Sequence, residues 1–360
     1  LRDSAHLQEE EAARASKHPD RALHRKPLYT QDDAARVAKL FRPVDYDDMR
    51  PDIAGCRFRL SDAGHILGSS IVELWFDTRK LTFSGDLGRY GRPLLNDPTP
   101  IAESDVVLCE STYGDRLHPA TDPQADLGGV IADAMGRNGV LVIPSFAVGR
   151  TQEILYAIGA LQRASAIPDV KIYVDSPMGI EADAMMERHP EATRFDLRAR
   201  FGPADTSLGA KNVVIAQSAA ESIAINSIGR GAIVISSSGM ASGGRVLHHL
   251  RNRLPRATDT VCFVGFQGPG TLGRTLLGGV RRVKIFGVPV DVDAHVAHID
   301  GFSAHADRAE LLRWFGGFRD KPAVFIVHAD PPAAASLAKA CCDTYALQAK
   351  PAVQGETVTI

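Results

Sequence analysis

From Val106 onwards, short apolar segments alternate with longer stretches in which hydrophobic residues recur at helical spacing. The apolar segments are rich in valine and isoleucine, which is typical of strands buried in a sheet. They are Val106–Cys109, Val140–Ile143, Val170–Val174, Val213–Ala216, Ala232–Ile235, Val261–Val264 and Ala323–Val327. Alternation of strands and helices over this length predicts an α/β fold with a parallel or mixed sheet.

The region before Val106 has a different pattern. Residues 56–60 alternate between apolar and polar side chains, residues 71–76 are rich in β-forming types, and a turn at 77–80 leads into residues 81–83. This spacing predicts two or three antiparallel strands. Further upstream, the polar and alanine-rich segment Leu1–His18 is typical of a surface helix.

Several helix starts are marked by side chains that accept hydrogen bonds from the first backbone N–H groups of a helix, or by proline at the first helical position. They are Thr30 with Asp33, Asp122-Pro123, Ser176-Pro177 and Ser218 with Glu221. The sequence contains no internal repeat, low-complexity segment or long linker. A second domain is therefore expected as an insertion within the first domain.

Composition and charge limit the classes of function. At 360 residues, with 44% hydrophobic and 23% charged residues, the chain is long enough for about two soluble domains. Lys and Arg number 41 and Asp and Glu number 43, so the net charge of −2 leaves only a local basic groove for binding nucleic acid. No apolar run approaches the ~20 residues of a membrane helix. Five cysteines, an odd number without a Cys-x-x-Cys pair, favour the reducing cytoplasm.

Carboxylates and histidines follow several of the predicted strands. Asp86 comes after residues 81–84, Glu110 after Val106–Cys109, and His328 after Ala323–Val327, while glycines flank His65 in a loop between two strands. Ligands of open α/β sheets gather at the carboxyl ends of strands. Imidazole and carboxylate are the ligand set of zinc or manganese in a hydrolytic site, where the metal lowers the pKa of water to about 7.

Each of these residues is also compatible with an ordinary structural role. His65 suits a loop histidine that bonds its own backbone, and Asp86 is a common type of turn residue. Glu110 suits a helix cap or an arginine partner, and His328 suits a hydrogen-bonded core histidine. Taken together, the four residues favour a metal site.

Two further clusters have candidate chemistry. His305 lies within Gly301–Asp307, just before a predicted helix, where a carboxylate could hold it as a general acid; a simple strand-to-helix turn is the alternative. Hydroxyls and glycines in 236–244 precede Arg245 at a second helix start and suit an anion cradle, and Arg150 follows another strand. The alternatives to an anion cradle are an ordinary βα turn for the hydroxyls and glycines and a solvent-exposed helix face for the arginine.

The order of the motifs resembles the β-CASP branch of the metallo-β-lactamase fold, a group of RNA-processing nucleases that includes the polyadenylation-factor endonuclease. The segments are GHILGSS, SGDLG, ESTYGDRLH, PSFAVGRTQE, DSPM, SSSGMASGGR, GFSAHAD and a late VH. The resemblance implies a metallo-β-lactamase αββα sandwich with an inserted α/β β-CASP domain. The expected boundaries are 1–114 for the first part of the sandwich, 115–303 for the insertion and 304–360 for the return.

The resemblance also implies roles for individual residues. His65, Asp86 and His328 would be ligands of two zinc ions (manganese being an alternative), with Asp86 bridging them and taking part in catalysis. Glu110 and His305 would handle the proton of the leaving group. The expected reaction is hydrolysis of phosphodiester bonds in single-stranded RNA. Further expected substrate contacts are His118, Arg150, Ser238, Gly239 and Arg245.

One signature of the family, His-x-His-x-Asp-His, does not occur in the sequence. The expectation is therefore a chain that lacks the first strands, on the order of 90 residues at typical domain size, and that is inactive by itself. The alternative is a catalytically inactive scaffold or RNA-binding subunit. A small-molecule hydrolase of the same fold is less consistent with the Glu110–His305 pair. A homodimer remains open.

Overall fold

The computed structural model describes residues 1–16, 26–53, 55–202 and 207–358. The chain divides into two compact units, Leu1–Asp45 and Tyr46–Ile360. No helix within these described ranges is both long enough and apolar enough to span a membrane.

The first unit contains helices α1 (Arg2–Ser16) and α2 (Gln31–Ala38). The Thr30 hydroxyl accepts from the Asp33 N–H, and the Asp33 carboxylate accepts from the Thr30 N–H, so the predicted capping signal is confirmed. The predicted helix at the start of the chain is confirmed up to Ser16, and residues 17 and 18 lie outside the described part of the chain.

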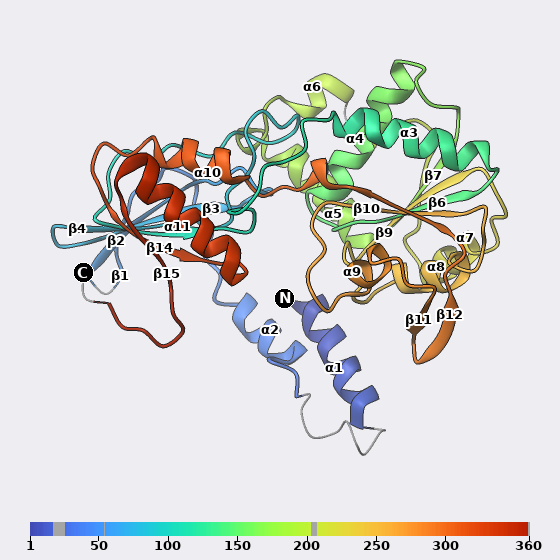
Figure 1. The fold of residues 1–360 in the computed structure, drawn as a ribbon, viewed down its shortest axis with the longest axis horizontal. Coiled ribbons are helices and arrows are strands. Elements are labelled where there is room, and N and C mark those ends of the chain that lie inside the picture. The colour runs from blue at the N-terminus through green and yellow to red at the C-terminus, as the bar shows by residue number, and fades with distance from the viewer. Residues whose placement is uncertain (17–25, 54, 203–206, 359–360) are drawn as a thin grey trace. The chain divides into compact units, whose positions relative to one another are not determined.

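The second unit begins with a seven-stranded mixed sheet in the order β1-β2-β3-β4-β5-β14-β15 (Figure 1). Its strands are β1 (Arg50–Ile53), β2 (Cys56–Asp62), β3 (Ser70–Phe76), β4 (Arg79–Phe83), β5 (Val106–Glu110), β14 (Ala323–Val327) and β15 (Gln348–Pro351). The strands from β1 to β4 pair antiparallel, as predicted for β2 to β4, and β4, β5, β14 and β15 pair parallel. The sequence did not predict β1 and β15, which lie at the two edges.

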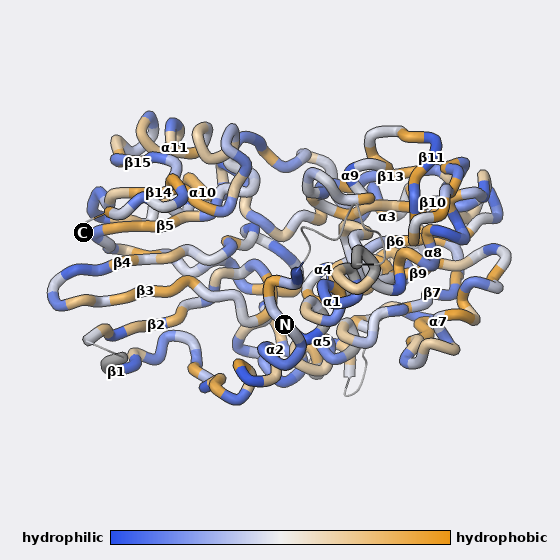
Figure 2. Tube along the Cα trace, turned by 90° about the horizontal axis from the view of Figure 1, so that it is seen from below, coloured by the Kyte–Doolittle hydropathy of each residue, from blue (hydrophilic) through white to orange (hydrophobic). Residues whose placement is uncertain are grey.

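Helices α10 (Arg308–Phe315) and α11 (Pro331–Tyr345) cover one face of this sheet. Every second residue of β5 and β14, for example Val107 and Ile326, packs in one core with Trp314 and Leu337. Figure 2 shows the hydrophobic colour along β5. The described residues thus contribute one helix layer and one sheet of the predicted αββα arrangement.

A six-stranded parallel sheet lies between β5 and β14 in the chain, in the order β13-β10-β6-β9-β7-β8. Its strands are β6 (Val140–Pro144), β7 (Lys171–Asp175), β8 (Val213–Ile215), β9 (Ala232–Ser236), β10 (Thr260–Val264) and β13 (His295–Ile299). Each predicted strand in this region is present to within one residue at its ends. The hairpin β11 (Arg282–Ile285) and β12 (Val288–Asp291) was not predicted.

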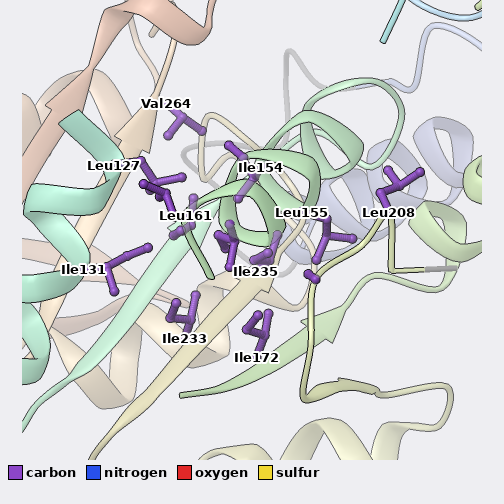
Figure 3. Close-up of a cluster of buried hydrophobic side chains, with 14 of the residues drawn as sticks. Leu127, Ile131, Ile154, Leu155, Leu161, Ile172, Leu208, Ile233, Ile235 and Val264 are labelled. Carbon is purple, nitrogen blue, oxygen red and sulfur yellow. The ribbon is translucent and has the colours of Figure 1, made fainter. Parts of the chain in front are cut away.

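Helices cover both faces of this sheet, which explains why its central strands β6, β9 and β10 are buried at every position and mostly apolar. One core joins the sheet to α3 (Pro123–Gly136), α4 (Arg150–Arg163), α5 (Pro177–Arg188) and α6 (Leu197–Phe201), and the other joins it to α7 (Ala219–Ile225), α8 (Val246–Arg253) and α9 (Leu272–Leu277). Figure 3 shows the first core, where Leu127 and Ile131 of α3 and Ile154 of α4 lie against Ile233 and Ile235.

The predicted helix starts in this region are confirmed. Asp122 accepts from Gln124 N–H, Ser176 accepts from Gly179 N–H, and Ser218 forms a reciprocal capping box with Glu221. The fold is therefore of the α/β class expected, a mixed sheet interrupted by an inserted second domain. Every strand of the inserted sheet lies inside the expected range 115–303, although the boundaries themselves stay predictions.

A buried carboxyl group in the inserted domain should make stability depend on pH. Asp183 on α5 is almost fully buried, and its Oδ1 accepts from Gln152 Nε2 at 2.7 Å. Burial raises its pKa from 3.8 to about 7, more than the Gln152 hydrogen bond lowers it. Between about pH 4 and pH 7 the folded chain therefore binds a proton that the unfolded chain has lost, and the free energy of unfolding falls as pH rises.

We predict that Asp183→Asn reduces this fall, since an amide cannot ionise and keeps an acceptor for Gln152. Urea unfolding between pH 4.5 and pH 8 measures the effect, with Asp133→Asn on the exposed side of α3 as the control. Equal pH slopes for wild type and Asp183→Asn would contradict the prediction.

Candidate metal and catalytic site

The predicted site residues meet at one edge of the seven-stranded sheet. Because β4, β5 and β14 are neighbours and parallel, the loops that follow them emerge at the same edge. The loop between β2 and β3 and the segment before α10 reach the same place. The structure thereby brings together five of the predicted residues: His65, Asp86, Glu110, His305 and His328.

Close approach of two loops fixes the positions of His65 and Asp86. The Gly88 N–H donates to the Ala63 carbonyl oxygen at 2.8 Å, and a Cβ atom on Gly88 would overlap the Gly64 carbonyl. Glycine is therefore needed for the backbones to touch at this point. The Ala306 N–H donates to the Leu87 carbonyl at 2.8 Å, which attaches the His305 segment to the same pair of loops.

The Asp86 carboxylate lies between two imidazoles. Its Oδ2 is 3.9 Å from His65 Nε2, and its Oδ1 is 3.2 Å from His328 Nδ1. One ligand atom from each of His65, Asp86 and His305 lies within 4.8 Å of the other two. Each carboxylate oxygen thus faces a different imidazole, which is an arrangement suited to a carboxylate that bridges two ions.

The protonation state of His65 also suits a metal ligand. Burial, reinforced by the charge of His305, lowers the pKa of His65 to about 4, so its ring is neutral near pH 7 and keeps a lone pair. Its Nδ1 is buried and has no hydrogen-bond partner within the described residues. Neutral imidazole with carboxylate matches the preference of zinc and manganese, so the residues present fit such an ion.

His328 has an unusual backbone. It follows β14 directly, its φ is +49°, and its side chain is 58% exposed. A left-handed conformation costs a residue other than glycine about 1 kcal/mol or more, and such residues cluster at functional sites. This conformation is accompanied by the 3.2 Å approach of the ring to Asp86.

Glu110 and His305 form a buried pair beside these ligands. Glu110 Oε1 accepts from His305 Nδ1 at 2.9 Å, which sets Nδ1 as the protonated ring nitrogen. Burial would raise the pKa of Glu110 and lower that of His305, but their mutual attraction and hydrogen bond outweigh it. The pKa of Glu110 is therefore lowered and that of His305 raised, which favours a charged pair.

His118 supports the His305 segment from the other side. Its ring lies 4.9 Å from the Tyr113 ring, its Nε2 is 2.9 Å from the His305 carbonyl oxygen, and its backbone N–H donates to Asp307. Burial lowers the pKa of His118. The residue is thus near the site, and contact with substrate stays a prediction.

Arg150 is buried, and its guanidinium already has a carboxylate partner. It pairs with Glu153 one turn later on α4, and the same carboxylate accepts from Arg92 at 2.8 and 3.0 Å. Since Arg92 precedes β5 and Glu153 belongs to the inserted domain, this cluster joins the two domains. A role of Arg150 in binding substrate stays a prediction.

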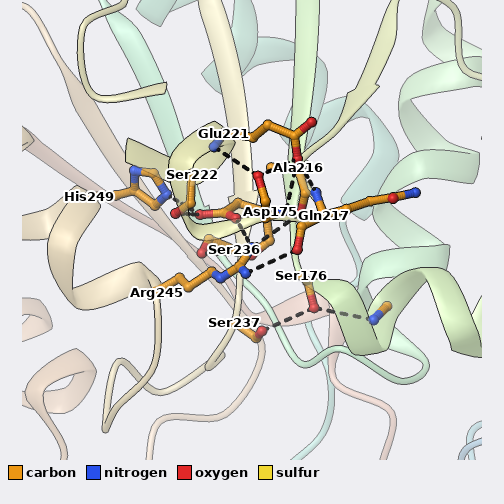
Figure 4. A network of polar contacts seen from close by, with 12 residues as sticks. Asp175, Ser176, Ala216, Gln217, Glu221, Ser222, Ser236, Ser237, Arg245 and His249 are labelled. Carbon is orange, nitrogen blue, oxygen red and sulfur yellow. Dashed lines mark hydrogen bonds and ion pairs between the residues drawn. The ribbon is translucent and has the colours of Figure 1, made fainter. Parts of the chain in front are cut away.

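Arg245 lies in a separate polar network at the end of β7 (Figure 4). Its Nη1 donates to Asp175 Oδ1 at 2.7 Å and to the Ala216 carbonyl. Asp175 is fully buried and also accepts from His249 and Ser222. No hydrogen bond found in the described ranges links this network, Ser238 or Gly239 to the metal-ligand candidates. Substrate contacts there also stay predictions.

Comparison with known proteins agrees with these observations. Residues 151–276 match the family described as Beta-Casp domain, and residues 289–349 match the Zn-dependent metallo-hydrolase RNA specificity domain. A ribonuclease of Thermus thermophilus is 32% identical over 87% of this chain and 72% of that protein. The chain belongs to the β-CASP family of metallo-β-lactamase-fold nucleases.

Other relatives of this β-CASP chain have related names. Transcription termination factor FttA of Pyrococcus abyssi is 33% identical over 87% of the chain, and an RNase J-like protein of Methanocaldococcus jannaschii is 30% identical over 84%. The chain spans 50% of the length of the first and 70% of the second.

Sequence reasoning missed several residues that shape the β-CASP site. Arg92, Glu153 and Asp175 were not singled out. The spacing of Arg150 and Glu153 on one helix face is a local signal that was available. Arg92 and Asp175 have no local signal, because their partners lie 61 and 70 residues further along the chain.

We predict that Glu110→Gln lowers the pKa of His305 in protein from which a chelator has removed zinc. Glutamine keeps a hydrogen-bond acceptor but removes the negative charge that favours the imidazolium. NMR titration of the histidine ring nitrogens measures the change, with the signal of His189 beside exposed Glu191 as an internal control. An unchanged His305 titration would show that the charge of Glu110 does not set this pKa.

We predict that Arg245→Met lowers the free energy of unfolding by about 2 kcal/mol, because it leaves the buried Asp175 carboxylate with one cation fewer. Urea denaturation at pH 7 measures the loss. Arg251→Met, at an exposed position of the same helix, is the matched control. Equal losses in the two variants would mean that the Asp175 pairing is not what Arg245 contributes.

Proposed function

We propose that this protein hydrolyses phosphodiester bonds in single-stranded RNA at a site that holds two zinc ions, or a similar pair such as manganese. The observation that carries the proposal is the Asp86 carboxylate between His65 and His328, directly beside the Glu110–His305 pair. The match to a zinc-dependent RNA specificity domain and the relatives named as ribonucleases support it.

His65, Asp86 and His328 would hold the metal ions. When bound, such ions lower the pKa of water and offset negative charge that develops on a phosphate. The residues themselves contribute neutral imidazole at His65 and a carboxylate whose two oxygens face different directions. Their loops are held by backbone contacts, so the ligands are positioned before a substrate arrives.

His305 acts as the general acid in this proposal. Its Nδ1–H is held by Glu110, which leaves Nε2 as the ring nitrogen available to substrate. The raised pKa of His305 keeps it protonated to higher pH, so it can deliver a proton to the departing 3′ oxygen. Glu110 orients the ring and stabilises its positive charge, as a carboxylate does for histidine in other hydrolases.

Substrate contacts at His118, Ser238 and Gly239 belong to the same proposal. Arg150 and Arg245 each have a buried carboxylate partner. They would therefore act on RNA mainly by electrostatic attraction at a distance and by holding nearby loops in position. All five cysteines are free, which supports a reducing cytoplasmic location. That the protein forms a homodimer is also a prediction.

A catalytically inactive scaffold is the second candidate. It is favoured by one observation, the absence of the His-x-His-x-Asp-His signature from these 360 residues, which leaves few protein ligands for two ions. Zinc content separates the two candidates, because the enzyme needs close to two zinc ions per chain and a scaffold does not.

We predict that Asp86→Asn, in protein with its complete native sequence, lowers cleavage of labelled single-stranded RNA by at least about 100-fold and reduces bound zinc. Glu110→Gln should lower the cleavage rate by roughly 100-fold while zinc content stays at the wild-type level. Gel-resolved cleavage and elemental analysis measure the two quantities.

Exposed Asp133→Asn is the control for loss of a carboxylate. Full activity of Asp86→Asn would exclude the proposed site. Wild-type protein without zinc and without cleavage would favour the scaffold instead.

A further inference from the structure

Phe146 is an exposed aromatic residue in a part of the fold where exposure is unusual. It follows β6, whose residues are all buried, and yet its side chain is 42% exposed. Burial of a hydrophobic side chain lowers the free energy of the folded protein. The exposure of a phenylalanine next to a buried strand therefore needs an explanation.

The backbone of Phe146 is held firmly. Its carbonyl oxygen accepts from the Thr151 N–H at 3.1 Å, from the Thr151 hydroxyl at 2.8 Å and from the Ser145 hydroxyl at 3.3 Å. The Ser145 N–H in turn donates to the Ser236 carbonyl of the neighbouring strand at 2.9 Å. Thr151 and Ser145 are both fully buried. The ring is therefore presented to solvent by a fixed main chain.

Part of the ring rests on the backbone of the loop after β9. A Cβ atom on Gly239 would lie 2.8 Å from Phe146 Cδ2, 3.0 Å from Cε2 and 2.9 Å from the Phe146 nitrogen. Glycine at this position therefore makes room for the ring. The loop begins with the small residues Ser237, Ser238 and Gly239, and Gly239 is the one that lies against the ring.

The same segment lies next to the candidate metal site. Gly149, at the end of this loop, has φ +84°, and a Cβ atom on it would lie 3.0 Å from Cγ2 of Ile66. Ile66 is the neighbour of His65. Three residues of chain reach at most about 11 Å, so the Phe146 backbone lies within that distance of Gly149, which contacts Ile66 of the His65 loop.

We propose that Phe146 is a stacking platform for one unpaired nucleobase of the RNA that this site cleaves. This inference rests on the proposed function. A rigid aromatic ring beside a phosphodiester-cleaving site provides a flat face for any base, and such stacking tolerates different sequences. A protein partner is less favoured, because a stable protein interface buries about 800 Å² on each side around an apolar centre, whereas this is a single exposed ring against the backbone of Gly239.

The test measures RNA binding separately from cleavage. Protein with its complete native sequence carries Glu110→Gln, which slows turnover and leaves the metal ligands His65, Asp86 and His328 in place. It is titrated into single-stranded RNA that contains the fluorescent base 2-aminopurine at successive positions. Phe146→Ala, Phe146→Leu and Phe146→Trp are compared in this background. Phe76→Ala is the matched control, since Phe76 is 45% exposed and lies at the far end of β3 from the His65 loop.

We expect 2-aminopurine at one position to be quenched by the parent and by Phe146→Trp, and not by Phe146→Ala or Phe146→Leu. The dissociation constant should rise by roughly 10-fold to 100-fold in Phe146→Ala and stay unchanged in Phe76→Ala. Leucine keeps an apolar side chain but has no aromatic face, so it separates stacking from general hydrophobic contact. Thermal unfolding of each variant checks that it is folded.

The outcomes distinguish this inference from the proposed function. Unchanged quenching and affinity in Phe146→Ala would overturn the stacking role, while cleavage of RNA by the wild type would leave the proposed function intact. Equal affinity of Phe146→Leu and the parent, without quenching in either, would indicate an apolar contact such as one with a protein and would also overturn it. Absence of RNA binding and of RNA cleavage by wild-type protein would overturn both.

Discussion

The buried carboxylate of Glu110 joins the segments from which the candidate site is built. One of its oxygens accepts from the Leu87 N–H and from His305, and the other accepts from the Thr112 N–H. Leu87 is the neighbour of Asp86, so this one side chain fixes the Asp86 loop, the end of β5 and the His305 ring. A carboxylate that is only 1% exposed is stable as an anion only with such partners. The hydrogen bonds that stabilise the buried Glu110 carboxylate are therefore the same ones that hold the segments of the site together.

Because of the inserted domain, the hydrogen bond between Glu110 and His305 connects distant parts of the second unit. Glu110 comes before the insertion and His305 after it, 195 residues later, so their hydrogen bond closes the chain around the inserted sheet. Arg92 and Glu153 form a second connection, and the Arg89 and Gly301 contact at 2.6 Å forms a third. Because the Glu110–His305 hydrogen bond is itself one of these connections, the site depends on how the two sheets are held against each other. An inserted domain can thus influence chemistry to which it contributes few side chains.

Local patterns in the sequence were sufficient for much of the fold and for the centre of the site. The apolar segments become strands because strands covered on both faces need apolar residues throughout, and Ser218 with Glu221 forms its capping box within four residues of chain. Asp86, Glu110 and His328 were singled out because ligands gather where the strands of an open α/β sheet end, and His65 because glycines flank it in a loop between two strands. Edge strands β1 and β15 were missed, since they are short and only partly apolar. The partner of Arg245 shows the other limit: the helix start was predicted, but Asp175 lies 70 residues earlier in the chain, and its pairing with Arg245 depends on tertiary contacts.

The paired arginines also bear on how this chain would hold RNA. A net charge of −2 provides little general attraction for a polyanion, and Arg92, Arg150 and Arg245 are already engaged with Glu153 or Asp175. On the proposed function, counterion release would contribute less to binding than it does for a basic protein, and the affinity for RNA would depend less steeply on salt. Binding on the proposed function has to come from contacts that do not require net charge, namely metal ions on the phosphate and an aromatic face on a base. Both would lie along the short path from His65 and Ile66 through Gly149 to Phe146, where the two domains touch.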